Sequence, residues 1–115
     1  MLENVFSYGT LQTKPVQLKL FGRTMDCYPD VLTGYKHSLI KIEDELVIAE
    51  SGMTHYQNIL YTGNPLDTIR GMVINIKETE LQQADEYEKT AGYTRIRVDL
   101  ESGKTAWVFL HPDTH

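Results

Sequence analysis

The clearest alternation of hydrophobic and polar residues lies near the end of the chain. Residues 93–100 place aliphatic side chains at every second position and mostly charged ones between them, which is the period of a half-buried strand. A Ser-Gly turn signal follows at 102–103, and residues 105–110 are again apolar and β-branched. The pattern predicts a β-hairpin over residues 93–110.

Further apolar runs predict strands elsewhere in the chain. The predicted strands cover residues 5–8, 35–42, 46–49 and 70–76, with a short apolar run at 59–61. An acidic turn, Glu43-Asp44-Glu45, separates the second and third runs, so we expect these two to pair as a hairpin. We expect residues 51–58 to form a loop. Tyr28-Pro29-Asp30 is a turn signal, and residues 11–28 before it fit either a short helix or an irregular segment.

One segment, near residues 79–88, has the pattern of an amphipathic helix. Thr79 with Gln82 three residues later predicts a capping box at its start. At about 100° per residue, the face predicted to enter the core carries Leu81, Ala84, Asp85 and Glu88. With the strands, this helix predicts an α+β fold: a curled, mostly antiparallel sheet or small β-barrel with one principal helix.

Glu88 is the unusual member of that helix face. Burial disfavours the charged form of a carboxyl group, so we expect its pKa to be raised. A buried carboxylate is either paired with a cation, here Lys89 or Arg95, or kept for acid–base chemistry. A close Arg95 would lower the pKa and weaken the catalytic interpretation.

Size and charge narrow the function classes. With 115 residues the chain predicts a single domain, 1–115, with one modest core. A net charge of −5 without a basic cluster argues against a nucleic-acid partner. We expect no membrane partner and no signal peptide, since no apolar run approaches the roughly 20 residues of a span. Cys27, the only cysteine, cannot form an internal disulfide, which fits a cytoplasmic protein. The sequence does not indicate the oligomeric state.

Other candidate sites are weaker. The four histidines, His37, His55, His111 and His115, lack metal-ligand spacing, so we expect no metal site. Asp85 and Glu88 together supply too few oxygen ligands for a divalent cation. Cys27 has no nucleophile signature and is interpreted as a free, partly buried thiol. Trp107 is interpreted as core or as a pocket wall. Solvated turn positions are expected for Asp26, Asp30, Glu43, Asp44 and Glu45.

The segment Tyr8-Gly9-Thr10-Leu11 ends the first predicted strand in a tight turn. Backbone N–H groups of such a turn can bind a carboxylate or another anion. With Gly71-Met72-Val73, the Asp85–Glu88 segment and Tyr93-Thr94-Arg95, it forms an ordered set. This set resembles the gamma-glutamylcyclotransferase-like family, in its small single-domain branch. The resemblance covers residues 5–110 and implies a barrel-like sheet with a helix beside its mouth.

The resemblance also implies a reaction and a site. The substrate would be a small γ-glutamyl amide or amine that cyclises, with release of 5-oxoproline and no cofactor. Glu88 would be the general acid–base, and Tyr93 would line the pocket. The glutamyl end would bind the backbone amides of Tyr8, Gly9, Thr10 and Leu11.

Two features depart from the family pattern, and two other function classes stay open. Gln12 stands where many relatives have a basic residue, and we expect no C-terminal specificity loop, because little sequence follows Leu110. The leaving amine is therefore open among dipeptides, γ-glutamylamines, glutathione and an antibiotic-like acyl compound. The alternatives to an enzyme are a non-catalytic module that binds an amino-acid-like ligand in the same pocket, and an interaction protein that uses a sheet edge.

Overall fold

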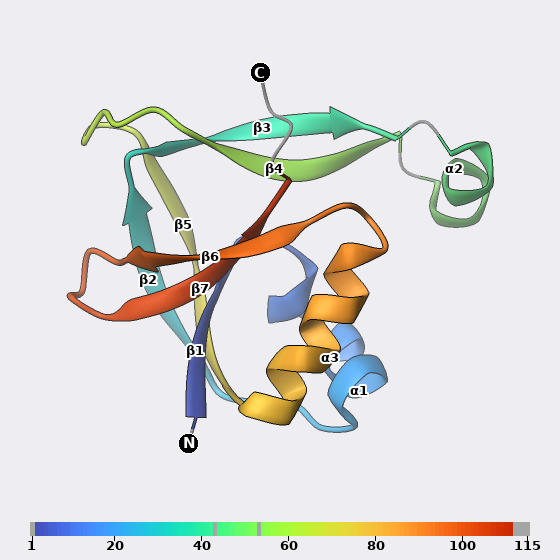
Figure 1. The fold of residues 1–115 in the computed structure, drawn as a ribbon, viewed down its shortest axis with the longest axis horizontal. Coiled ribbons are helices and arrows are strands. Elements are labelled where there is room, and N and C mark those ends of the chain that lie inside the picture. Colours follow the sequence, from blue (N-terminus) through green and yellow to red (C-terminus); the bar gives the residue numbers. More distant parts are fainter. Residues whose placement is uncertain (1, 43, 53, 112–115) are drawn as a thin grey trace.

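A curled sheet of five strands forms the centre of the protein in the computed structural model, which describes residues 2–42, 44–52 and 54–111 (Figure 1). Its strands, in spatial order, are β2 (Cys27–Thr33), β5 (Thr68–Lys77), β1 (Leu2–Ser7), β7 (Thr105–Leu110) and β6 (Thr94–Asp99). All neighbouring strands are antiparallel except β1 and β7. The predicted α+β fold with a curled, mostly antiparallel sheet is confirmed.

The sheet curls until its two edges approach each other, but it does not close into a barrel. The N–H of Glu101, in the β6–β7 turn, donates to the Val31 carbonyl of β2 at 2.9 Å. Beside it, the Ser102 hydroxyl donates to the Asp30 carboxylate. These contacts join β2 to the β6–β7 turn and leave the rest of the two edge strands unpaired with each other.

A second sheet lies across one end of the curled sheet and contains only β3 (Tyr35–Lys41) and β4 (His55–Tyr61) (Figure 1). Asn58 is fully buried and ties this hairpin to the end of β7. Its side chain accepts from the N–H of His111 at 2.9 Å and donates to the His111 carbonyl at 3.3 Å. The β3–β4 hairpin is therefore fixed to the end of β7.

The described residues also contain four helical segments: the 3₁₀ turn η1 (Thr10–Gln12), α1 (Lys14–Phe21), α2 (Glu45–Ser51) and α3 (Glu78–Lys89). Helices α1 and α3 lie together against one face of the curled sheet, and α2 projects from the far end of the β3–β4 hairpin (Figure 1). None of the helices in the described ranges is long and apolar enough to cross a bilayer.

The curled sheet is buried on both faces, so the core has two parts. Alternate residues of one strand enter different parts: Phe6 packs with Val73 and Val108, whereas Val5 packs with Leu81 and helix α3. Gly71 of β5 is required where β5 crosses β1. A Cβ atom there would lie 2.5 Å from the Ser7 carbonyl oxygen and 2.7 Å from Cζ of Phe6.

Two strand and loop predictions in the middle of the chain are wrong. Residues 46–49, predicted as a strand, belong to α2, so the partner of β3 is β4 instead. Asp44 caps this helix by accepting from the N–H of Leu46 at 2.9 Å, and Gly52 ends it with φ of 71°. The predicted loop at 51–58 contains the first half of β4. Glu43, from the predicted turn, lies outside the described residues.

The predicted turn at Tyr28-Pro29-Asp30 is also wrong, because these residues lie inside β2. β2 is an edge strand, where proline is tolerated since one side of the strand needs no ladder donors. Asp30 is consequently not a solvated turn residue. It is half-buried and accepts hydrogen bonds from Ser102 and from the N–H of Val31, which lower its pKa against the opposing effect of burial.

Candidate functional site

Helix α3 carries Glu88 to the mouth of a pocket. Its inner face is the predicted one, with Ala84 and Leu81 buried against the sheet. The helix ends directly after Glu88, whose backbone carbonyl accepts from the N–H groups of Ala91 and Tyr93, each at 3.0 Å. These bonds fix the last helical turn and hence the position from which the Glu88 side chain enters the pocket.

The start of α3 differs from the prediction. Lys77, not Thr79, is the N-cap, and the Glu80 carboxylate, not the Gln82 amide, accepts from its N–H at 2.8 Å. Glu80 also forms a bidentate ion pair with Arg23, at 2.7 and 2.8 Å. Glu80 does not belong to the helix face predicted to enter the core, yet its side chain is buried, with 7% exposed. The hydrogen bonds from Arg23 hold its pKa below the ordinary value.

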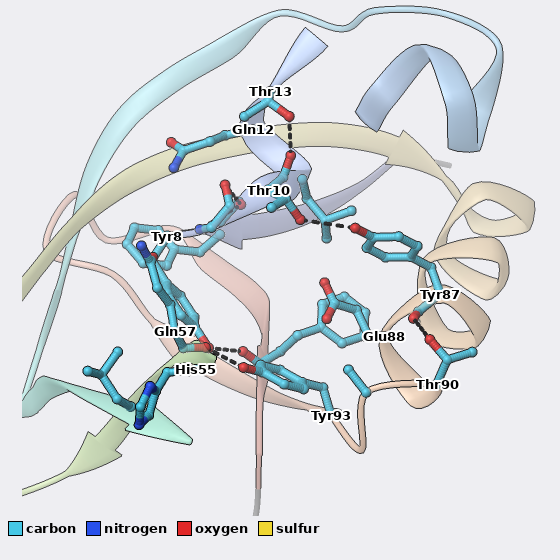
Figure 2. Close-up of a pocket in the computed structure, with 17 residues that line it drawn as sticks. Tyr8, Thr10, Gln12, Thr13, His55, Gln57, Tyr87, Glu88, Thr90 and Tyr93 are labelled. Atoms are coloured by element: carbon cyan, nitrogen blue, oxygen red, sulfur yellow. Dashed lines mark hydrogen bonds between the residues drawn. The ribbon is translucent and has the colours of Figure 1, made fainter. Parts of the chain in front are cut away.

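The pocket has a volume of about 740 Å³ and is built from three parts of the chain. Figure 2 shows the turn after β1 on one side, the end of α3 on another, and the β3–β4 hairpin on the third. It is lined by Phe6, Ser7, Tyr8, Gly9, Thr10, Leu11, Gln12, Thr13, Leu39, His55, Gln57, Tyr87, Glu88, Thr90, Ala91, Tyr93 and Phe109. All six residues that the sequence assigned to a site therefore come together.

The carboxylate of Glu88 lies in this pocket without a cation. Within the described residues no ion pair reaches it, and Arg95 binds Asp85 instead, at 2.7 Å. Burial raises the pKa of Glu88 to about 7. The expected rise in pKa thus has burial as its cause, and pairing with Arg95, which would have opposed it, does not occur.

The turn after β1 is held by its own hydrogen bonds. The Thr10 carbonyl accepts from the N–H of Thr13 at 2.9 Å and from its hydroxyl at 2.6 Å. The N–H of Gly9 donates to the Ser7 hydroxyl at 3.3 Å. No hydrogen bond within the described ranges uses the N–H groups of Thr10 and Leu11. Two donors beside the pocket are therefore open to an anion.

Two tyrosines connect the three walls of the pocket. The hydroxyls of Tyr87, at the end of α3, and Thr10 lie 3.2 Å apart, which joins the helix to the turn (Figure 2). The Tyr93 hydroxyl donates to the backbone carbonyl of Gln57 in β4. The helix end thus contacts both other walls.

Tyr8 forms the inner side of the pocket. Its hydroxyl donates to the Phe109 carbonyl at 2.6 Å. Burial, and then the neighbouring Tyr93 and Glu88, raise the pKa of Tyr8 far above its ordinary value, so it stays a neutral hydrogen-bond donor.

Comparison with known proteins identifies the family. The family model described as "Gamma-glutamyl cyclotransferase, AIG2-like" matches residues 5–115. The chain belongs to this family. No curated protein sequence matches it significantly.

Solved structures confirm the gamma-glutamyl cyclotransferase-like fold. A solution structure from Arabidopsis thaliana is 23% identical with a TM-score of 0.70, and the match covers 96% of this chain and 62% of that one. An uncharacterized protein from Homo sapiens is 19% identical with a TM-score of 0.71, over 99% and 69% of the two chains. A structure named gamma-glutamyl cyclotransferase is 18% identical with a TM-score of 0.75, over 100% and 69%. The chain thus spans about 62% of the length of the Arabidopsis protein.

Several pocket residues of this family member were missed by sequence reasoning. Leu39, His55 and Gln57 come from the hairpin, whose second strand was predicted as a loop, so no pattern placed them near Glu88. Tyr87 stands inside the recognised Asp85–Glu88 segment, and its place beside Glu88 at the helix end is the signal that could have found it.

Among the described residues, the weaker candidates other than His55 do not line the pocket, and His115, like Glu43, lies outside the described residues. No group of three metal-ligating side chains occurs in the described part of the chain. Cys27 is free and half-buried, as expected. Trp107 packs against the core and does not line the pocket. The guanidinium groups of Arg95 and Arg97 lie 4.2 and 4.4 Å from the centre of its ring.

Proposed function

We propose that this protein cleaves a small γ-glutamyl amide or amine by intramolecular cyclisation, with release of 5-oxoproline and a free amine. Glu88 is the general acid–base, the turn from Tyr8 to Leu11 binds the glutamyl end, and Tyr93 is a pocket wall. The reaction draws only on protein groups, and we place it in the cytoplasm, where the free thiol of Cys27 would stay reduced.

One observation carries the proposal: the half-buried carboxylate of Glu88, with no cation paired to it among the described residues, faces the turn across the pocket (Figure 2). Burying a charge that has no partner costs stability, so a purely structural role does not account for it. With a pKa raised to about 7, Glu88 is half-ionised near neutral pH. A general acid–base works best when its pKa lies near the working pH, because it can then both accept and return a proton.

The chemistry needs few groups. The α-amine of the γ-glutamyl unit attacks its own side-chain carbonyl carbon, so a new C–N bond closes a five-membered ring. Because the nucleophile is tethered, much of the acceleration comes from proximity. The α-ammonium group must first lose a proton, and the Glu88 carboxylate is placed to accept it. That proton goes to the leaving nitrogen as its bond to the carbonyl carbon breaks. The attacking nitrogen loses a second proton as it becomes the lactam N–H, and Glu88, ionised again, accepts this proton and passes it to solvent.

The turn supplies the complementary part of the site. The open N–H groups of Thr10 and Leu11 can bind the substrate α-carboxylate or the oxyanion that forms during attack. Gln12, half-buried in the pocket wall, offers an amide in place of a cation. Binding at this turn therefore depends on hydrogen bonds more than on charge pairing.

A substrate panel tests the reaction. Release of 5-oxoproline would be measured from γ-glutamyl dipeptides, γ-glutamylamines and glutathione, with wild type, Glu88→Gln and Glu86→Gln. Glu86 is exposed on the same helix and serves as the matched control. We expect Glu88→Gln to lower turnover by at least about 100-fold and Glu86→Gln to leave it unchanged.

Other results would change the conclusion. Unchanged turnover by folded Glu88→Gln would remove Glu88 from the mechanism. If wild type released no 5-oxoproline from any substrate but were stabilised thermally by 5-oxoproline, a non-catalytic binding module would replace the enzyme, since a ligand of the native state must raise its melting temperature.

A further inference from the structure

Gln17 is a buried polar residue outside the pocket and outside every motif recognised in the sequence. It lies on α1, is 1% exposed, and is one of the largest fully buried side chains. A buried amide requires partners for its donors and its acceptor, so its contacts define what it holds in place.

The contacts of Gln17 join the pocket turn to the rest of the fold. Its amide nitrogen Nε2 donates to the backbone carbonyl of Leu11 at 2.9 Å, with Cys27 Sγ at 3.7 Å as a weaker second acceptor. Its oxygen Oε1 accepts from the N–H of Met25 at 3.1 Å. The chemistry of these partners fixes the orientation of the amide, because a carbonyl can only accept and an N–H can only donate.

The Leu11 carbonyl, which accepts from Gln17, is part of the 3₁₀ turn that lines the pocket. The N–H groups of Thr10 and Leu11 in this turn have no hydrogen-bond partner among the described residues. The bonds from Thr13 to Thr10 stay within the turn, and the bond from Thr10 to Tyr87 is exposed. The hydrogen bond from Gln17 to Leu11, by contrast, is shielded from water. Gln17 also binds the N–H of Met25, just before β2, and β2 is paired with β5 of the central sheet.

We propose that Gln17 is a positioning residue for the substrate turn: its amide clamps the Leu11 carbonyl to the segment before β2, so that the open N–H groups keep their place opposite Glu88. This inference rests on the proposed function in so far as the turn is the glutamyl-binding element. Gln17 does not touch the pocket, so its effect passes through the turn.

Two variants separate positioning from simple stability. Gln17→Met fills a similar volume and removes all three side-chain hydrogen bonds, including those to the Leu11 carbonyl and from the Met25 N–H. We expect it to lower kcat/KM at least about 10-fold, since small displacements of a binding element cost that much or more. Glu80→Gln is the control, because it weakens the fold at the far end of α3 and touches nothing in the pocket. All rates are compared per folded molecule, at a temperature where each variant is native.

A third variant gives a pH signature. Gln17→Glu keeps the shape of the side chain, and burial raises the pKa of the new carboxyl group. When protonated, that group can still donate to Leu11 and accept from Met25; when ionised, it can only accept. We expect the ratio of its kcat/KM to that of wild type to fall as the pH rises, and the same ratio for Gln17→Met to be independent of pH.

Hydrogen exchange keeps this test separate from the reaction. The N–H of Thr13, which donates to Thr10, should exchange about 10-fold faster in Gln17→Met, with the amides of α3 unchanged. If wild type showed no turnover, the proposed reaction would be contradicted. The exchange rate of the Thr13 N–H would still test whether Gln17 positions the turn. Unchanged Thr13 exchange in Gln17→Met, or a kcat/KM equal to that of Glu80→Gln, would overturn the inference.

Discussion

Helix α3 carries a glutamate that is at least partly buried near each of its ends. The two differ in whether a cation pairs with the carboxylate. Glu80, at the start, is held by two hydrogen bonds from Arg23 and caps the helix through the N–H of Lys77. Glu88, at the other end, enters the pocket, and within the described ranges no cation pairs with it. The pKa of Glu80 is lowered by Arg23, whereas burial raises that of Glu88 to about 7.

This contrast shows what distinguishes a structural carboxylate from a reactive one. The degree of burial alone does not, because Glu80 is the more buried of the two and still has the lower pKa, while Glu88 is half-buried. A partner makes ionisation of Glu80 favourable and uses the charge to stabilise the helix. Without one, Glu88 keeps a proton that can be exchanged near neutral pH, which suits acid–base chemistry and costs stability.

The largest expected effect of the contrast is on the pH dependence of the rate. Glu88 must be ionised to accept a proton, so kcat/KM of wild type should fall about 10-fold per pH unit below about 7. Steady-state rates between pH 4.5 and 9 on the best substrate would check this. If Glu80→Gln shows the same fall in kcat/KM below about pH 7, the fall does not come from Glu80. A fall that begins only near pH 4.5 in wild type would contradict a raised pKa of Glu88.

The next effect is a gain in stability from removing the buried charge. Because the pKa of Glu88 is higher in the folded protein than in the unfolded chain, the folded protein binds the extra proton, and stability falls as the pH rises from 4.5 through 7. Glu88→Gln avoids this loss and should be more stable than wild type by about 2 kcal/mol above pH 7, with no difference below pH 4.5. Urea unfolding at pH 4 and pH 8 measures both values. A loss of stability at pH 8 would indicate that Glu88 has a structural role.

A smaller effect of opposite sign is expected at the other end of the helix. Glu80→Ala removes the acceptor for the Lys77 N–H and should destabilise the protein by about 1–2 kcal/mol. Because its pKa is lowered, the contribution of Glu80 is present at neutral pH and is lost as the pH falls through its folded-state value. Turnover per folded molecule should stay within about twofold of wild type. A large loss of turnover per folded molecule would contradict the claim that Glu80 has only a structural role.

The sequence predicted most of the central sheet, because strict alternation and turn residues are local signals. The β6–β7 hairpin, β1 and β5 followed from them. The α2 region could not be predicted in the same way. Leu46 to Ala49 is a short aliphatic run that fits strand or helix, and the choice depends on the cap at Asp44 and on the pairing of β3 with β4.

The site was partly predictable for the same reason. The helical period placed Glu88 on the buried face, and the family motif placed the turn and Tyr93. The ion pairs could not be read from spacing: Arg95 binds Asp85 rather than Glu88, and Arg23 meets Glu80 across 57 residues of chain. Such contacts between distant segments depend on how α1, α3 and β6 pack together.

The most direct measurement is an NMR titration of the side-chain carboxyl carbons of Glu88 and Glu80 in one sample, with assignments from Glu88→Gln and Glu80→Gln. The account predicts a Glu88 midpoint near 7 and a Glu80 midpoint below its ordinary value. Two midpoints close to 4.5 would contradict it, because neither burial nor pairing would then separate the two ends of α3.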